Sequence, residues 1–239
     1  MSGFVIETKK GFEVSPKATH SLLANQLLLD RIVQIADTAV GDMLDVGAGE
    51  SPYFPVFRSK IKSYTRVDLS ELKHAGKPSV CADAAHLPFQ DKAFDTVLCT
   101  EVIEHCTCPS KVLREIYRVL KSSGCAIISA PFMYPYHDDP VDYYRFTDRG
   151  LSHLIENVGL KVVQIHPLGT RMDFGVDLYS KCMITILEKI NFLKGTFINI
   201  CVLFPQIVYL FFRRDRSRDE AFTLGHVIVA KKSAQTQQS

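Results

Sequence analysis

The chain has 239 residues, of which 46% are hydrophobic and 23% are charged, and its net charge is +2. These values are ordinary for a folded domain with a proper core, and the length suits one large α/β domain or a domain with an appendage. A nearly neutral chain lacks the clustered basic surface that nucleic-acid binding requires, so we predict no nucleic-acid partner.

Seven cysteines are scattered along the chain, and none of them form the paired spacing of a zinc site or a redox motif. Several lie within apolar runs, where a reduced cysteine behaves as a small hydrophobic residue. The N-terminal segment lacks the basic and apolar regions of a secretion signal. We therefore predict a cytoplasmic protein without disulfides.

The first predicted element is a helix over residues 16–38, because apolar residues such as Leu23, Leu27 and Ile32 recur there at helical spacing. Ser15 is a suitable N-cap for this helix, and Pro16 is suited to its first turn.

Short apolar runs then alternate with helical patterns through residues 40–170. Strands are predicted over 42–47, 63–69, 78–83, 93–99, 125–130 and 160–168, and helices over 110–124 and 151–159. A last strand is predicted within residues 222–232. Alternating strands and helices predict an α/β fold with a mainly parallel sheet and helices on both faces.

The first of these strands runs into a glycine turn, in the stretch MLDVGAGESP. Gly47 and Gly49 allow a tight turn and a close approach of the backbone to a ligand, because they lack a Cβ. Pro52 stands where the dinucleotide fingerprint has its third glycine, and Asp45 would repel a pyrophosphate at this position. The turn therefore predicts a ligand other than a dinucleotide.

Two more carboxylates follow the next two strands, Asp68 and Asp83. Ligands of such sheets bind at the carboxyl ends of the strands, where these side chains and Asp45 are expected to gather. Three carboxylates around a glycine turn favour a ligand with a ribose, an amine and a positive charge.

Four stretches resemble, in the correct order, the motifs of class I S-adenosylmethionine-dependent methyltransferases of the type 11 group: LDVGAGESPYF, YTRVDLS, CADAAHLPFQDKAFDTVLCTEVIEH and VLREIYRVLKSSGCAIISAP. The resemblance covers residues 40–132. It implies a Rossmann-like sheet of seven strands with the last one antiparallel. It also implies S-adenosylmethionine as the cofactor and S-adenosylhomocysteine as the product.

The same resemblance implies roles for individual residues. Asp45 would hold the amino group of the methionine moiety, Asp68 the ribose hydroxyls, and Asp83 the adenine edge. The full set of implied cofactor-binding residues is Asp45, Gly47, Gly49, Asp68, Leu69, Asp83, Ala84, Thr100 and Glu101.

The segment after the fifth strand, PFMYPYHDDPVDYYRFTDRG, is predicted to border the acceptor. We predict that His137 acts as a general base or orients the acceptor. Tyr143 and Arg145 would bind a polar or anionic acceptor, since arginine offers a planar fork to such groups, and the neighbouring Tyr144 would help to shape this side. In the alternative, Arg145 pairs with Asp142 or Asp148 and only holds the loop in place, and His137 is a solvated turn residue.

The element EVIEH places Glu101, Glu104 and His105 on one face of a helix, if a helix has begun there. With His137, these residues would suit a divalent ion, and small-RNA 2′-O-methyltransferases have a similar element. The element also recurs in members of the family without a metal. We therefore predict no metal site.

Residues 171–221 are predicted to form a helical insertion before the last strand, and its segment 196–212 is nearly all apolar. This run is too short and too interrupted to span a membrane. It is predicted to be extra core, a lid over the acceptor, or a surface for a homodimer or peripheral membrane contact through residues 181–214. We treat the whole chain, 1–239, as one domain.

The loop sequence YPYHDDPVDYYRFT loosely resembles bacterial methyltransferases of surface-polysaccharide and specialised-metabolite pathways. The predicted function is methylation of a small-molecule acceptor, on an oxygen of a sugar or specialised metabolite. One alternative is a lipid or quinone acceptor at a membrane surface. The other is a non-catalytic, methyltransferase-like partner subunit.

Overall fold

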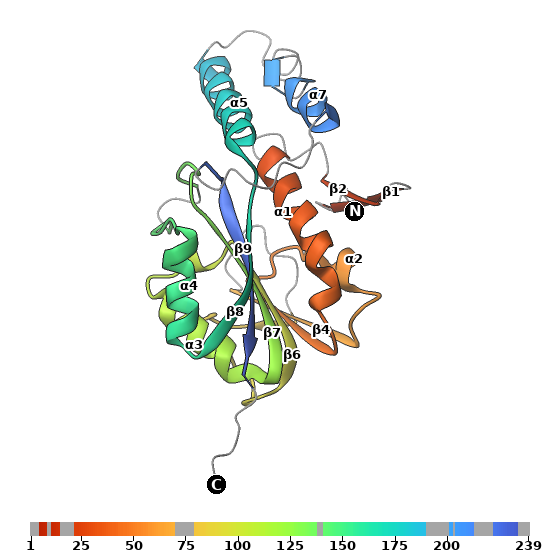
Figure 1. Ribbon diagram of the computed structural model, residues 1–239, viewed down its shortest axis with the longest axis vertical. Helices are drawn as coiled ribbons and strands as arrows, with labels where there is room; N and C mark the ends of the chain where they lie inside the picture. Colours follow the sequence, from red (N-terminus) through yellow and green to blue (C-terminus); the bar gives the residue numbers. More distant parts are fainter. Residues whose placement is uncertain are drawn as a thin grey trace.

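The computed structural model describes residues 5–8, 11–14, 22–69, 79–137, 141–189, 201–202, 204–212 and 222–233. Its centre is a seven-stranded sheet in the order β5-β4-β3-β6-β7-β9-β8 (Figure 1). The strands are β3 Asp42–Val46, β4 Ser63–Asp68, β5 Val80–Cys81, β6 Phe94–Thr100, β7 Leu120–Pro131, β8 Leu160–Pro167 and β9 Gly225–Lys232. Only β9 runs antiparallel, against both β7 and β8. The predicted fold class is confirmed.

The order of the strands indicates at which edge of the sheet a ligand would bind, and this edge is called the ligand edge below. The chain proceeds outward from β3 to β4 and β5, and then returns to add β6 on the other side of β3. Ligands of open α/β sheets bind at such a reversal, outside the carboxyl ends of the strands. The residues that follow β3, β4, β5, β6 and β7 therefore share one edge.

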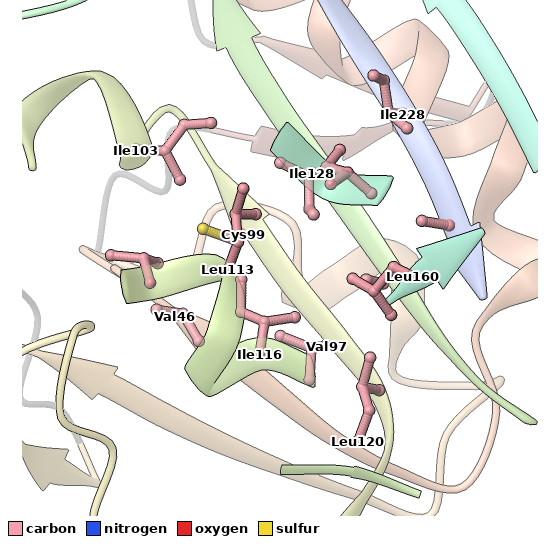
Figure 2. Packing of buried hydrophobic residues seen from close by; sticks show 14 of the residues in the cluster. Val46, Val97, Cys99, Ile103, Leu113, Ile116, Leu120, Ile128, Leu160 and Ile228 are labelled. Atoms are coloured by element: carbon pink, nitrogen blue, oxygen red, sulfur yellow. The ribbon is translucent and has the colours of Figure 1, made fainter. Parts of the chain in front are cut away.

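Helices cover both faces of the sheet (Figure 1). The amphipathic helix α3 Pro109–Val119 and the helix α4 Asp148–Asn157 cover one face, and α1 Leu22–Ile35 and α2 Phe54–Phe57 cover the other. Figure 2 shows Leu113 and Ile116 of α3 packed against Val97 and Cys99 of the sheet, and all four are fully buried. Burying one such aliphatic side chain contributes about 1.5–3 kcal/mol, so this packing holds the ligand edge in place.

The predicted helix over 110–124 is wrong at its end, because α3 stops at Val119 and β7 begins at Leu120. Leu120 has extended backbone angles and pairs with Phe94 of β6. Lys232 of β9 donates to the backbone oxygen of Leu120 at 2.9 Å, which satisfies a carbonyl that a longer helix would have used. Residues 121–123 are polar and not buried, so no local apolar pattern distinguishes a helix from a strand here, and pairing with β6 decides.

Near the N-terminus, the described part of the predicted helix is α1 Leu22–Ile35, which ends before residue 38 and is followed by a 3-10 turn over Ala36–Thr38. The proposed cap residues, Ser15 and Pro16, lie outside the described residues. A hairpin of β1 Val5–Thr8 and β2 Gly11–Val14 precedes α1 and was not predicted.

The described residues of the insertion include the helices α5 Arg171–Lys189 and α7 Phe204–Phe212, as predicted. Ile184 of α5 and the nearby Val202 are buried against each other, so part of the insertion forms a small core of its own. Met172 and Phe204 are each 65% exposed, which leaves apolar surface on both helices. Among the described helices, none combines the length and the apolar character that crossing a membrane requires.

Candidate functional site

The glycine turn follows β3 directly and is held against β4. The amides of Gly47 and Ala48 both donate to the oxygen of Val67, at 2.9 and 3.0 Å. Gly47 and Gly49 have φ values of +69° and +50°, which residues with a Cβ rarely adopt. A Cβ on Gly47 would lie 2.2 Å from a methyl of Val102, whereas a Cβ on Gly49 would meet no atom within 4 Å. Gly49 therefore faces open space into which a ligand can fit.

Asp45 lies on β3 immediately before this turn and is only 2% exposed. Tyr64 of β4 donates its hydroxyl hydrogen to Asp45 Oδ2 at 2.5 Å. Burial, together with the nearby charge of Asp68, raises the pKa of Asp45 to about 7, although the hydrogen bond from Tyr64 lowers it. Sequence reasoning missed Tyr64, because a tyrosine in a strand carries no local sign of a polar partner.

Asp68 ends β4 and is 5% exposed. Its Oδ2 accepts from the Gly49 amide at 2.6 Å, and its Oδ1 accepts from the Leu69 amide at 2.7 Å. A carboxylate oxygen can accept a second hydrogen bond, so both oxygens can still bind ligand hydroxyls. The structure thus brings Asp45, Asp68 and the glycine turn together, as the sequence predicted.

Asp83 lies further out along the same edge. Cys81 of β5 pairs with Asp68, so Asp83 and Ala84 follow two and three residues beyond that pair. The Asp83 side chain is exposed, accepts from the Ala85 amide at 2.8 Å, and lies 3.6 Å from His86. The Asp83 carboxylate is therefore accessible to a ligand at the outer end of this edge, beside β5.

The end of β6 supplies Thr100 and Glu101. Glu101 has a φ of +53°, an uncommon conformation for a residue other than glycine and one that costs on the order of 1–3 kcal/mol. Ser129 of β7, another residue that sequence reasoning missed, donates its hydroxyl to Glu101 Oε1 at 2.7 Å. Burial raises the pKa of the Glu101 carboxyl. The surrounding sheet thus holds Glu101 in a strained, fixed orientation.

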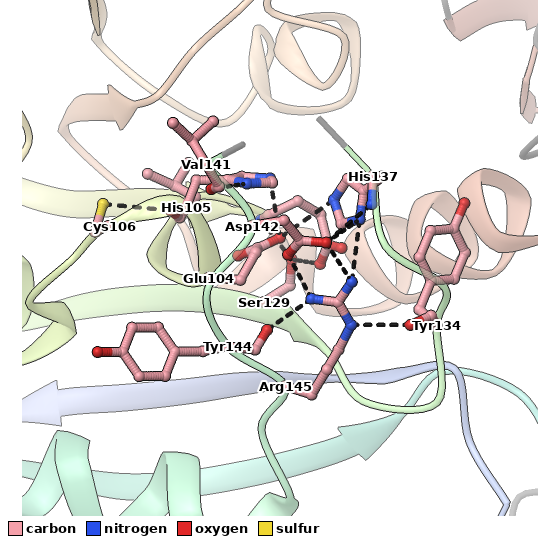
Figure 3. Close-up of polar contacts among 12 residues, drawn as sticks. Glu104, His105, Cys106, Ser129, Tyr134, His137, Val141, Asp142, Tyr144 and Arg145 are labelled. Carbon is pink, nitrogen blue, oxygen red and sulfur yellow. Dashed lines mark hydrogen bonds and ion pairs between the residues drawn. The ribbon is translucent and has the colours of Figure 1, made fainter. Parts of the chain in front are cut away.

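Arg145 lies at the centre of the loop after β7 (Figure 3). Its guanidinium donates to both oxygens of Asp142, each at 2.5 Å. The remaining N–H groups donate to the backbone oxygens of Tyr134, Pro135 and Tyr144. All five N–H groups are used within the loop. This geometry does not offer Arg145 to an anionic acceptor and instead fits the alternative in which Arg145 pins the loop.

His137 is held by the same network. Its amide donates to Asp142 Oδ2 at 2.9 Å, and its Nδ1 lies 3.4 Å from that oxygen. Its Nε2 lies 4.0 Å from Glu104 Oε1, and the side chain is 27% exposed. Burial lowers the pKa of His137, which favours a neutral ring with a free lone pair. His137 is therefore oriented by its neighbours and is not a solvated turn residue.

The two tyrosines of the loop differ in their surroundings. Tyr143 is half exposed, and its amide donates to the backbone oxygen of Glu104 at 2.9 Å. Tyr144 donates its hydroxyl to the backbone oxygen of Thr107 at 3.1 Å and stacks on Phe146. The Tyr143 side chain is the more accessible of the two, whereas Tyr144 anchors the loop to the segment after β6.

A cavity of about 750 Å³ lies beside the glycine turn. Its walls include Glu50 and Ser51 from the turn segment and Tyr64 from β4, but not Asp45 or Asp68. The cavity thus extends along α2 and the first residues of β4, and the two buried carboxylates do not line it.

Part of the chain is similar to known proteins. Residues 44–128 match the family described as "Methyltransferase domain". A probable S-adenosylmethionine-dependent methyltransferase of Mycobacterium tuberculosis, Rv3030, is 30% identical over 123 residues, which are 47% of this chain and 45% of that protein. The uncharacterized protein MJ0638 of Methanocaldococcus jannaschii is 36% identical over 88 residues, which are 36% of this chain and 39% of that protein. The matches thus span less than half the length of either relative.

A solved structure shares the fold over nearly the whole chain. It is a possible histamine N-methyltransferase from Thermotoga maritima, with a TM-score of 0.55 and 17% identity, and the match covers 91% of this chain and 95% of that one. At this identity the likeness shows the fold alone.

Proposed function

We propose that residues 44–128, which match the methyltransferase domain family, form a class I S-adenosylmethionine-dependent methyltransferase domain. We further propose that the chain methylates an oxygen of a small-molecule acceptor, on a sugar or specialised metabolite. S-adenosylmethionine supplies a methyl group on a positively charged sulfur: the acceptor oxygen forms the new C–O bond, the C–S bond breaks with its electrons going to sulfur, and the acceptor loses a proton. The observation that carries the proposal is the pair of buried carboxylates, Asp45 and Asp68, around the open face of Gly49.

The residues at this edge suit that cofactor. Asp68 keeps acceptor capacity for the ribose hydroxyls, and the accessible carboxylate of Asp83 suits the exocyclic amine of adenine. Asp45, once ionised, complements a cationic amino group. The space next to Gly49 would be filled by a side chain at that position, which supports a role for the bare backbone in ligand contact.

The acceptor side is formed by the loop after β7. His137 presents a neutral imidazole that can orient an acceptor hydroxyl or take its proton, and Asp142 holds the ring in place. Tyr143 offers an accessible phenol for a polar acceptor. Arg145 acts as a positioning residue, because its hydrogen bonds hold Asp142 and the loop backbone.

The test of cofactor binding is calorimetric titration of the purified chain with S-adenosylmethionine and S-adenosylhomocysteine. We expect Asp68→Ala to weaken binding about 10- to 100-fold, since each hydrogen bond to a charged group contributes about 1.5–3 kcal/mol. Asp37→Ala, which changes a highly exposed acid away from the site, is the matched control and should bind as the wild type does. Equal affinity in the wild type and Asp68→Ala would contradict the assignment of this edge.

Turnover is tested by screening sugars and polar metabolites for formation of S-adenosylhomocysteine. We expect His137→Gln to lose turnover while it keeps cofactor affinity, because His137 lies on the acceptor side. Tight cofactor binding without turnover on any acceptor would favour the non-catalytic partner subunit.

The exposed apolar surface of α5 and α7 supports a second candidate, a lipid or quinone acceptor reached at a membrane surface. Residues 181–214 would then contact lipid, or alternatively a second copy of the chain. Co-sedimentation with phosphatidylcholine vesicles tests this candidate. Binding that is lost in Phe204→Glu would support it, and no binding by the wild type would reject it.

A further inference from the structure

Against the expectation from the sequence, we propose that Glu104, His105 and His137 bind one divalent transition-metal ion. The donor atoms of these three side chains lie within 4.8 Å of one another. His105 and Glu104 come from the turn after β6, and His137 comes from the loop after β7 (Figure 3). The two segments therefore meet at the ligand edge of the sheet, next to Glu101.

Glu104 supplies the strongest reason for an ion. Its side chain is fully buried, and neither carboxylate oxygen has a hydrogen-bond partner among the described residues. A buried carboxylate without a partner is costly, and removing the partner of a buried charge typically has a large effect on stability. The nearby guanidinium of Arg145 donates all of its N–H groups elsewhere. A cation between Glu104 and the histidines would satisfy the carboxylate.

The histidines are turned so that a lone pair of each faces Glu104. His105 Nδ1 lies 2.9 Å from the backbone oxygen of Val141, which can only accept, so this nitrogen carries the proton and Nε2 is free. His105 Nε2 lies 3.7 Å from Glu104 Oε1. Metal-binding histidines are commonly held in this way, with the other ring nitrogen donating to a carbonyl or a carboxylate.

His137 has the corresponding arrangement. Its Nδ1 lies 3.4 Å from Asp142 Oδ2, and also 3.4 Å from the backbone oxygen of Pro135 and from Arg145, while Nε2 lies 4.0 Å from Glu104 Oε1. The rings of His105 and His137 meet edge to face, with centroids 4.8 Å apart. Both rings therefore converge on the same carboxylate oxygen.

The distances from the two histidine Nε2 atoms to Glu104 Oε1 suit ligands that share one metal ion better than they suit hydrogen bonds. Separations of 3.7 and 4.0 Å exceed the usual hydrogen-bond range. Two ligands that each lie about 2.1 Å from a tetrahedral ion are roughly 3.4 Å apart, so small side-chain movements would complete the coordination.

The donor set selects the kind of ion. Two imidazoles and one carboxylate favour zinc or another borderline transition metal over magnesium or calcium, which prefer oxygen ligands. Three protein ligands leave a position open for a further oxygen. If the proposed function holds, an acceptor hydroxyl at that position would become more acidic, and His137 would act as a ligand instead of a base. Binding of the ion itself does not depend on that function.

The test is calorimetric titration of the metal-free, full-length chain with Zn²⁺, and separately with Mg²⁺, in the absence of cofactor and acceptor. Cys81→Ser/Cys182→Ser serves as the parent protein, because exposed thiols also bind zinc. We expect one Zn²⁺ per chain, weak Mg²⁺ binding, and a loss of Zn²⁺ affinity of at least about 100-fold in Glu104→Gln and in His137→Asn. His153→Asn, which changes an exposed histidine of α4, is the control and should bind as the parent does.

Cobalt(II) absorption spectra provide a second measurement, because the ligand-field bands report nitrogen and oxygen ligands directly. Absence of stoichiometric Zn²⁺ binding in the parent, or full binding in both Glu104→Gln and His137→Asn, would overturn the proposal. If either variant does not fold, as judged by circular dichroism, His105→Asn replaces it. Failure of the proposed methyl transfer would leave these metal titrations unaffected, so the two outcomes are distinguishable.

Discussion

At the scale of single residues, the buried carboxyl of Asp45 lowers the stability of the folded chain at neutral pH, and it provides a negative charge that a ligand can use. Its carboxyl is buried between β3 and β4, with Tyr64 as its hydrogen-bond donor. Burial raises its pKa to about 7. The folded chain therefore holds a proton that the unfolded chain releases between the ordinary value of 3.8 and about 7. Over this window the contribution of Asp45 to stability falls as the pH rises, and above it the contribution is constant.

We predict that Asp45→Asn is more stable than the wild type without ligand, and that its advantage grows by about 2–3 kcal/mol between about pH 5 and pH 8. The amide cannot ionise, whereas the wild-type carboxyl must do so at a cost. Urea unfolding at several pH values measures the difference. The same variant should bind S-adenosylmethionine more weakly. A stability difference that does not change with pH would show that the carboxyl of Asp45 is not buried in this way.

At the scale of elements, the turn after β3 depends on two glycines for different reasons. Both have positive φ values, but only Gly47 has a neighbour, Val102, in the space that a side chain would need. Alanine at Gly49 meets strain alone, about 1–2 kcal/mol, whereas alanine at Gly47 adds the cost of overpacking, about 1–3 kcal/mol.

We therefore expect Gly47→Ala to lower the free energy of unfolding by more than Gly49→Ala does. Chemical denaturation of the ligand-free variants measures both. Adding Val102→Ala to Gly47→Ala should recover part of the loss, because it removes the methyl that the new Cβ would meet. If the losses in free energy of unfolding from Gly47→Ala and Val102→Ala are additive in the double variant, the contact between the new Cβ and Val102 is not the cause.

At the scale of the whole molecule, β9 joins distant parts of the chain. It pairs with β7 and β8, and its Lys232 donates to the backbone oxygens of Tyr117 and Leu120 at 2.6 and 2.9 Å. The ammonium also lies 4.1 Å from the centre of the Tyr117 ring. Charged hydrogen bonds and a positive group at a helix C-terminus both stabilise such a junction.

Replacing Lys232 with alanine should lower the free energy of unfolding by about 2 kcal/mol, because two carbonyls at the end of α3 lose a charged donor. Lys231→Ala, at the neighbouring exposed position, is the matched control and should change stability by less than about 0.5 kcal/mol. Guanidinium denaturation compares the two. Equal effects of the two substitutions would mean that the hydrogen bonds of Lys232 contribute little to stability.

Two further statements about the whole molecule stay predictions. They are the contacts of residues 181–214 with a membrane or a second copy of the chain, and a cytoplasmic location.

Local sequence determined much of the fold and the grouping of the candidate cofactor-binding residues. Apolar runs, glycine turns and helix patterns are short-range signals, so the strands at β3, β4, β6 and β9 lie close to the predicted bounds. Residues at the ends of parallel strands must share one edge. This is why the sequence alone suffices to group Asp45, Gly47, Gly49 and Asp68.

Tertiary structure decided what depends on partners far apart in the chain. The end of α3 is set by pairing with β6 and by Lys232, which is distant in sequence. Arg145 is committed to its own loop because five acceptors converge on it, and Glu104 meets His137 only because β6 and β7 are neighbours. Side-chain chemistry makes such contacts possible, but packing selects which groups meet, since a buried polar atom takes whatever partner the fold brings within reach.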